Sequence, residues 1–235
     1  ARSGRRCPQW CPQSAMDALA AFEKNFYFEH PAITALSQAE VDARRQEHRI
    51  EVTDPRAPKP VRTFLEAAFP EYLVAELDAS GFKAPTPIQS QAWPIAMSGY
   101  DLIGLASTGS GKTLGFALPA MVHIMAQDYL QAGDGPIALV LAPTRELALQ
   151  IKAECDKFGA SSQVKNTCIY GGVPKGPQKQ ALRDGAQVVV ATPGRLLDLS
   201  QEGSIELGRV EHVVLDEADP NPNPNPNPNP NPNPN

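Results

Sequence analysis

The 235-residue sequence predicts an α/β fold with an open, mostly parallel sheet and helices on both of its faces. Short apolar runs alternate with amphipathic, helix-like segments, which is typical of consecutive strand–helix–strand units. The apolar runs are 102–106, 138–142, 167–170, 188–191 and 212–215, and the helix-like segments are 113–126, 146–158, 176–183 and 194–201. In such a sheet we expect ligands to bind where the carboxyl ends of the strands meet.

Composition divides the chain into three zones. Residues 1–60 are a polar extension with a helical candidate at 32–49 and a proline-punctuated linker at 54–60, and 61–219 carry the periodic pattern of the domain. Residues 220–235 alternate Asn and Pro, so every second residue lacks an N–H and none is apolar. This tail is expected to be extended and disordered, as a linker, an added segment or an artefact; a role as a proline-rich ligand is the less favoured alternative.

Charge and composition exclude several classes of protein. A net charge of −5 argues against a static nucleic-acid coat and leaves room for local contacts to a polyanion. No apolar run reaches the length of a membrane span, and no hydrophobic segment follows the basic N-terminus, so we expect neither a membrane protein nor a secreted one. The four cysteines, Cys7, Cys11, Cys155 and Cys168, fit neither a zinc site nor a disulfide framework and are expected to be free thiols.

A candidate phosphate-binding loop follows the first apolar run and precedes a helix. It reads Ala106-Ser107-Thr108-Gly109-Ser110-Gly111-Lys112-Thr113. The two glycines allow a tight turn whose N–H groups point at phosphates, and the helix N-terminus adds its positive dipole end. Lys112 can reach the β- and γ-phosphates of a nucleotide, and the Thr113 hydroxyl can ligate Mg²⁺. A chance glycine-rich turn is the alternative, but the apolar run and helix around the loop argue against it.

The second candidate site is an apolar strand that runs into the acidic sequence Asp216-Glu217-Ala218-Asp219. Asp216 is placed to hold Mg²⁺, partly through water, and Glu217 to orient or deprotonate an attacking water. A solvated acidic loop would look the same. Together with the lysine loop about 100 residues upstream, however, this strand end predicts a nucleotide and magnesium site.

A third string supplies a resemblance to a known family. Gly81-Phe82-Lys83-Ala84-Pro85-Thr86-Pro87-Ile88-Gln89 resembles the Q motif of DEAD-box RNA helicases, and Phe64 lies 17 residues upstream. The resemblance implies that Gln89 reads adenine with its amide, that Phe64 stacks on the base, and that Phe82, Lys83 and Thr86 belong to the ATP site. By itself, Gln89 would be read as a polar surface residue.

Three more elements follow in the order of that family. Pro143-Thr144-Arg145-Glu146 resembles motif Ia, Gly171-Gly172 the GG element, and Thr192-Pro193-Gly194-Arg195 motif Ib. The resemblance implies that they hold the sugar-phosphate backbone of RNA without reading its bases. Arg145 could instead form an ion pair on the helix surface with Glu146 or Glu154.

The resemblance runs from about Phe22 to Asp219 and implies a RecA-like domain of the P-loop NTPase type. Lys112, Asp216 and Glu217 would be the catalytic residues, with ATP and Mg as cofactors and RNA as partner. The string Phe26-Tyr27-Phe28-Glu29-His30-Pro31 resembles a nuclear subgroup active in mRNA and ribosomal RNA metabolism. A nuclear location is therefore expected, with the cytoplasm left open, and a monomeric state.

The sequence departs from the family pattern after Asp219. The continuation of the first lobe and the second RecA-like lobe, which supplies arginine fingers, do not follow in these 235 residues. We therefore expect an incomplete first lobe of an ATP-dependent RNA helicase that binds ATP weakly and neither hydrolyses it nor unwinds RNA by itself. A non-catalytic ATP- and RNA-binding fragment is the alternative. A DNA-directed motor of the same superfamily is disfavoured by the Q motif.

Overall fold

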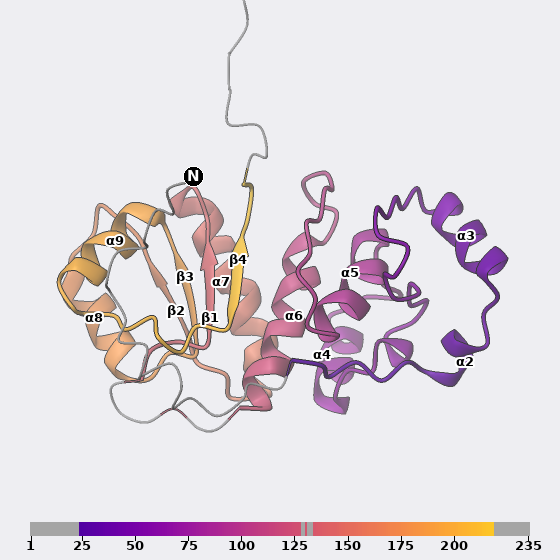
Figure 1. The fold of residues 1–235 in the computed structure, drawn as a ribbon. Coiled ribbons are helices and arrows are strands. Elements are labelled where there is room, and N and C mark those ends of the chain that lie inside the picture. The colour runs from indigo at the N-terminus through magenta and orange to yellow at the C-terminus, as the bar shows by residue number, and fades with distance from the viewer. Residues whose placement is uncertain (1–23, 128–129, 131–133, 219–235) are drawn as a thin grey trace, which may run out of the picture. The chain divides into compact units, whose positions relative to one another are not determined.

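A computed structural model describes residues 24–127, 130 and 134–218 (Figure 1). These residues form two compact units, one of 24–70 with 83–112 and the other of 71–82 with 113–218. The Asn-Pro tail, Asp219, Cys7 and Cys11 lie outside the described residues. The first unit contains described residues on both sides of position 60, and it also contains the Q-motif residues 83–89.

The first unit contains α2 (Pro31–Thr34), α3 (Gln38–Glu47), the 3₁₀ turn η1 (Leu65–Ala67) and α5 (Pro87–Met97). The expected helix over 32–49 is therefore two helices. The break comes at Ser37, which starts α3 with a capping box: its hydroxyl accepts from the Glu40 N–H at 3.3 Å, and Glu40 Oε2 accepts from the Ser37 N–H at 2.8 Å. A capped start satisfies the free N–H groups of a new helix, which favours the break over one continuous helix.

A proline inside α5 leaves a helix carbonyl available to Val61, the residue that follows the proline-punctuated linker. Pro94 has no N–H, so the Ser90 carbonyl four residues earlier loses its usual helical donor. The Val61 N–H takes that place and donates to the Ser90 oxygen at 2.9 Å, while the Ser90 hydroxyl donates to the Val61 carbonyl. Both groups are thereby satisfied in the buried interior, where an unpaired backbone polar group would be costly.

The strand expected at 102–106 does not form. These residues belong to no β-ladder in the described chain, and the side chains of Leu102, Ile103 and Leu105 are 43%, 86% and 79% exposed. Apolar composition shows that a segment can be buried, whereas a strand also needs a neighbour to accept its hydrogen bonds. The prediction from local pattern was wrong here for that reason.

The remaining elements alternate along the chain and build the second unit, with α6 starting at the last residue of the first. They are α4 (Glu71–Ala79), α6 (Lys112–Met125), β1 (Ala138–Leu141), α7 (Arg145–Gly159), β2 (Asn166–Ile169), α8 (Lys175–Arg183), β3 (Val188–Ala191), α9 (Pro193–Gln201) and β4 (His212–Leu215). The four strands are all parallel and lie in the order β2-β3-β1-β4. This confirms the predicted open parallel α/β sheet.

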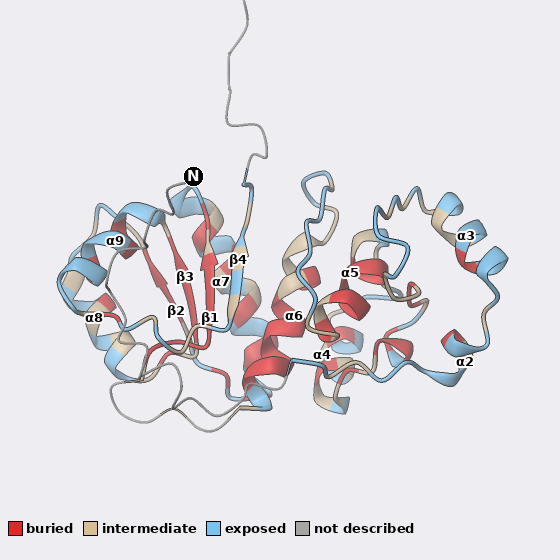
Figure 2. Ribbon diagram, in the orientation of Figure 1, coloured by how far each residue is buried: buried red, intermediate tan, exposed pale blue. Residues whose placement is uncertain are grey.

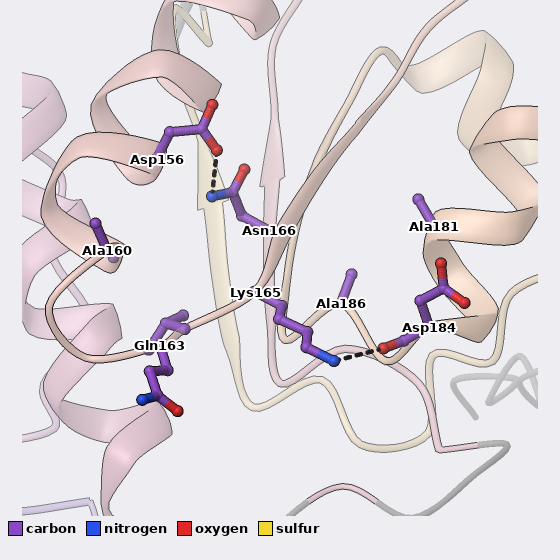
Figure 3. Close-up of a pocket in the computed structure, with 10 residues that line it drawn as sticks. Asp156, Ala160, Gln163, Lys165, Asn166, Ala181, Asp184 and Ala186 are labelled. Carbon is purple, nitrogen blue, oxygen red and sulfur yellow. Dashed lines mark hydrogen bonds between the residues drawn. The ribbon is translucent and has the colours of Figure 1, made fainter.

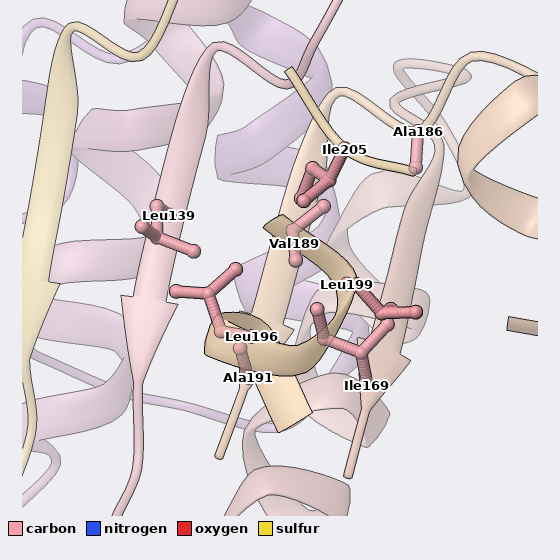
Figure 4. Close-up of a cluster of buried hydrophobic side chains, with 8 residues drawn as sticks. All are labelled: Leu139, Ile169, Ala186, Val189, Ala191, Leu196, Leu199 and Ile205. Atoms are coloured by element: carbon pink, nitrogen blue, oxygen red, sulfur yellow. The ribbon is translucent and has the colours of Figure 1, made fainter. Parts of the chain in front are cut away.

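Helices cover both faces of this sheet. On one face, Leu196 and Leu199 of α9 pack against Leu139 of β1 and Val189 of β3 in a buried apolar cluster (Figure 4). Because successive strand residues point to opposite faces, Val190 and its alternate neighbours lie on the other face, where α7 contacts β2 and β3. β1, β2 and β3 are mostly buried, while β4 at the edge is partly exposed (Figure 2).

Candidate functional site

The phosphate loop is folded before α6 begins at Lys112. Gly109 and Gly111 have φ values of +75° and +91°, which residues with a side chain rarely adopt. The Lys112 ammonium donates to the Ala106 carbonyl at 3.0 Å, so the loop curls around the lysine. The Ser110 hydroxyl is buried, and no described residue hydrogen-bonds to it. The positive-φ glycines, the lysine and this spare hydroxyl all fit a bound phosphate.

Gln89 is tied to the phosphate loop. Its amide nitrogen donates to the Gly111 carbonyl at 3.0 Å, and its amide oxygen accepts from the Thr86 N–H at 3.1 Å. A side chain at position 111 would displace the Gln89 amide, since its Cβ would lie 2.5 Å from that nitrogen. The Gln89 side chain keeps one N–H and one lone pair, which match an adenine edge, although the residue is only 3% exposed.

The other predicted ATP contacts differ in accessibility. Phe64 is 6% exposed, and its ring centroid lies 6.1 Å from that of Trp93, so in this conformation its face packs in the core. Phe82 is 37% exposed, with the Lys157 ammonium 5.7 Å from its ring centroid. Lys83 is exposed. Base stacking by Phe64 would need its ring to be more exposed than the 6% found here.

The predicted RNA-binding loops leave the sheet at one edge. Leu141 of β1 is in register with Ala191 of β3 and Leu215 of β4, and Ala191 with Ile169 of β2. All four parallel strands therefore end at the same level. From one side of the sheet to the other, the loops that follow are 170–173, 192–194, 142–144 and 216–217. The structure thus brings the predicted motif Ia, GG, motif Ib and acidic elements to a common carboxyl edge.

The motif Ia loop presents an exposed arginine at a helix N-terminus. The Thr144 hydroxyl caps α7 by accepting from the Leu147 N–H at 3.3 Å. Arg145 follows it and is exposed, with its guanidinium carbon 4.8 Å from the Tyr170 ring centroid. The alternative ion pair with Glu146 or Glu154 is replaced by this cation–π contact, which leaves the guanidinium at the carboxyl edge.

The motif Ib loop is organised differently. Thr192 precedes α9 with an extended backbone, and Gly194 is exposed in the first turn of that helix. Arg195, by contrast, is only 7% exposed. Its Nη1 donates to Gln178 Oε1 at 3.0 Å and its Nη2 to the Val173 carbonyl at 3.0 Å. Sequence reasoning missed Gln178, because a single glutamine in a polar helix gives no signal.

The acidic strand end begins as a continuation of the sheet. The Asp216 N–H donates to the Leu141 carbonyl at 2.9 Å, which fixes it just beyond β4. Glu217 follows with a φ of +52°, an uncommon value for a residue with a side chain, and its N–H donates to Asp216 Oδ1 at 3.1 Å. Among the described residues, no group of three or more His, Cys, Asp or Glu could hold a metal. A magnesium ion on Asp216 and Thr113 would therefore also need phosphate or water ligands.

A groove of about 520 Å³ lies elsewhere, at the amino ends of β2 and β3 (Figure 3). Asn166 donates to Asp156 Oδ1 at 2.9 Å on one side of it, and Lys165 to the Asp184 carbonyl at 3.1 Å on the other. None of the predicted site residues lines this groove. The predicted RNA-binding loops and the acidic strand end lie at the opposite edge of the sheet, where parallel sheets bind their ligands.

The two described cysteines have no reactive character. Cys155 and Cys168 are buried free thiols, and burial raises the pKa of Cys155 to about 12 and that of Cys168 to about 11. Both are therefore protonated at neutral pH. This confirms the expectation of free thiols for these two residues.

Every helix within the described ranges is too short or too polar to cross a membrane.

A parallel α/β sheet, a lysine-containing glycine loop before a helix, and an acidic strand end together define the class of P-loop nucleotide-binding domains. Comparison with known families narrows this class. Residues 86–221 match the model of the DEAD/DEAH box helicase family, which is more than half of the chain. The chain belongs to the DEAD/DEAH box helicase family, and the predicted RecA-like fold is confirmed.

Relatives and solved structures agree with this assignment. The chain is 60% identical over 204 residues to the ATP-dependent RNA helicase DBP2 of Pyricularia oryzae, covering 87% of this chain and 37% of that protein. It is 57% identical to DEAD-box ATP-dependent RNA helicase 20 of Oryza sativa subsp. japonica, covering 87% of this chain and 41% of that protein. The ADP-bound RNA helicase Prp28 of Chaetomium thermophilum superimposes with a TM-score of 0.74 at 37% identity, over 81% of this chain and 47% of that one. The chain thus spans less than half the length of each of these proteins.

Proposed function

We propose that this chain is the ATP- and RNA-binding first lobe of an ATP-dependent RNA helicase. The observation that carries the proposal is the hydrogen bond from Gln89 to the Gly111 carbonyl, at 3.0 Å. It joins the residue suited to an adenine edge to the loop suited to phosphates, so one nucleotide could satisfy both. The DBP2 relatives, named as ATP-dependent RNA helicases, support the same reading.

Each predicted site residue would contact a different part of the nucleotide or its metal ion. Gly109, Gly111 and the helix N-terminus after them would hold phosphates through backbone N–H groups, and Lys112 would exchange the Ala106 carbonyl for phosphate oxygens. Thr113 and Asp216 supply the oxygen atoms that Mg²⁺ prefers. ATP with Mg²⁺ supplies the phosphoryl group whose hydrolysis resets the enzyme. Glu217 is suited to orient the attacking water or accept its proton.

The carboxyl edge of the sheet suits an RNA backbone. The loops 171–172, 192–194 and 143–145 are largely exposed, leave the sheet at one level and include the first turns of α7 and α9. Helix N-termini and glycine N–H groups bind phosphates without regard to base identity. Arg145 adds a charge-assisted contact at the same edge. Binding of RNA at this edge should therefore depend little on sequence.

Replacement of the loop lysine tests the nucleotide site. Lys112→Ala should weaken binding of a fluorescent ATP analogue at least about 10-fold, because a cation that contacts phosphate is lost. Lys152→Ala is the matched control, since Lys152 lies in α7 and pairs with Asp156 at 2.6 Å. It should leave nucleotide affinity unchanged. Equal affinities for wild type and Lys112→Ala would refute the loop assignment.

A second proposal concerns turnover by the 235-residue chain alone. We infer that these 235 residues bind ATP and RNA without measurable hydrolysis. The family resemblance places the arginine fingers in a second lobe, and these residues cover 37% of the DBP2 protein of Pyricularia oryzae. An arginine finger contributes about 10³–10⁵ in rate. The measurement is phosphate release with and without single-stranded RNA. RNA-stimulated release above background would contradict this inference and leave the binding proposal intact.

A further inference from the structure

Gln178 is a buried polar residue of α8 outside every motif discussed so far. It is 7% exposed, and both ends of its amide are used. Its Nε2 donates to the Tyr170 carbonyl at 3.1 Å, and its Oε1 accepts from Arg195 Nη1 at 3.0 Å. Tyr170 immediately precedes the Gly171-Gly172 turn, and Arg195 lies in the first turn of α9. One side chain therefore connects two of the loops at the carboxyl edge.

Arg195 completes the connection. Its Nη2 donates to the Val173 carbonyl at 3.0 Å, on the far side of the Gly171-Gly172 turn from Tyr170. The turn is thus held at both of its ends, by Gln178 at residue 170 and by Arg195 at residue 173. Gly172 has a φ of +79°, and both glycines are exposed. Two glycines in succession would otherwise have wide conformational freedom.

Loss of these hydrogen bonds should be costly because the groups that make them are buried. A hydrogen bond to a charged guanidinium is stronger than one between neutral groups, and removal of its partner leaves a buried donor unsatisfied. Without Gln178, the Tyr170 carbonyl and Arg195 Nη1 would each lose the partner described here. The carboxylate of Asp198 lies 3.9 Å from Arg195 Nε, which is beyond hydrogen-bonding distance.

We propose that Gln178 is a positioning residue for RNA binding. With Arg195 it forms a clamp, the Gln178–Arg195 clamp, that fixes the Gly171-Gly172 turn relative to residues 192–194. N–H groups on the two loops then face one phosphate backbone at a set spacing, so that RNA does not have to order them on binding. The inference rests on the proposed RNA-binding function. It adds that the spacing of the two loops is set from behind, by a residue that does not touch RNA.

The test uses the 235-residue chain, a fluorescently labelled single-stranded RNA and a fluorescent ATP analogue. Gln178→Leu keeps approximately the side-chain volume and removes both hydrogen bonds. It should raise the RNA dissociation constant about 10-fold and leave nucleotide affinity unchanged. Gln180→Leu is the matched control, because Gln180 lies on the same helix, is exposed and bonds only to Asp184 among the side chains described. It should change neither affinity.

A double-mutant cycle separates positioning from general destabilisation. If the clamp acts as one unit, Gln178→Leu, Arg195→Met and the double variant should each weaken RNA binding by about the same 10-fold factor. Independent contributions would multiply to about 100-fold and would overturn the clamp, as would unchanged RNA affinity in Gln178→Leu.

A conservative variant covers the case in which Gln178→Leu does not fold. Gln178→Glu keeps an acceptor for Arg195 and loses only the donor to Tyr170, so it should lose less than Gln178→Leu, about 3-fold in RNA affinity. Wild-type affinity in this variant would overturn the proposal. Failure of the unchanged chain to bind RNA would instead refute the proposed function, and that outcome is read from wild type alone.

Discussion

Two apolar segments of similar composition have opposite fates in this molecule. Val189 and Val190 in β3 are fully buried, and their strand pairs with β1 on one side and β2 on the other. Ile103 and Leu105, in a segment that was also expected to be a strand, are 86% and 79% exposed and belong to no ladder in the described chain. In both segments, a short run of apolar residues was the observation that predicted a strand. The difference shows that strand formation depends on neighbours, which a local pattern cannot supply.

The largest effect should come from a charge placed in each segment. Val190→Asp buries an unpaired carboxylate between sheet and helix and should cost about 4 kcal/mol or more of unfolding free energy. Ile103→Asp should cost less than about 0.5 kcal/mol, because that side chain is already in water. Urea unfolding followed by circular dichroism measures both. A large loss in Ile103→Asp would show that the segment is buried in solution and would remove the contrast.

The second largest effect should come from acid pH, because it protonates a histidine in strand β4 of the sheet and no titratable group within residues 102–106. Burial, with a smaller contribution from His123, lowers the pKa of His212 in β4 from 6.5 to about 4. Below pH 6.5 the unfolded chain binds a proton that the folded chain refuses until about pH 4, so stability should fall as pH falls through this window. The loss for this one group is at most about 3 kcal/mol. His212→Gln should flatten the profile of unfolding free energy against pH between 6.5 and 4, and an unchanged slope would contradict the assignment.

The smallest effect is expected at Gly104, in the middle of the exposed segment. Among the described residues, a Cβ there would meet only Ile88 Cδ1, at 3.3 Å, and that methyl group is the far end of a flexible side chain. Gly104→Ala should therefore change the unfolding free energy by less than about 0.5 kcal/mol. A loss above about 1 kcal/mol in the same urea experiment would mean that residue 104 is closely packed.

Local patterns predicted much of the second unit. The runs at 188–191 and 212–215 are strands with those same ends, and the helices after β1, β2 and β3 begin within a residue of expectation. These elements are buried on one or both faces, so their apolar spacing records their surroundings. Helices α4 and α5 were not predicted. α5 has Pro94 in its interior, and its stability depends on Val61, which lies far away in sequence.

For the site, the strand pattern predicted that the four loops after the strands lie at one edge of the sheet, but not what each side chain contacts. The four loops reach one edge of the sheet because parallel strands in register must end together. That Arg195 is buried against Gln178, or that Phe64 packs on Trp93, depends on side-chain packing between distant segments. Such contacts leave no periodic trace in a sequence. The sequence did not predict these contacts because they depend on distant partners, as does the pairing that residues 102–106 would have needed to form a strand.

The arrangement around Pro94 bears on how this helix can vary. A proline inside a helix is ordinarily a defect that alanine would repair. Here the Ser90 carbonyl already receives the Val61 N–H, so an alanine at 94 would bring a second donor to the same oxygen. A carbonyl oxygen has two lone pairs, so it could accept both donors only if the helix and residue 61 kept their present positions. Because Pro94 has no N–H, the Ser90 oxygen is available to residue 61, which lies 29 positions earlier in the sequence.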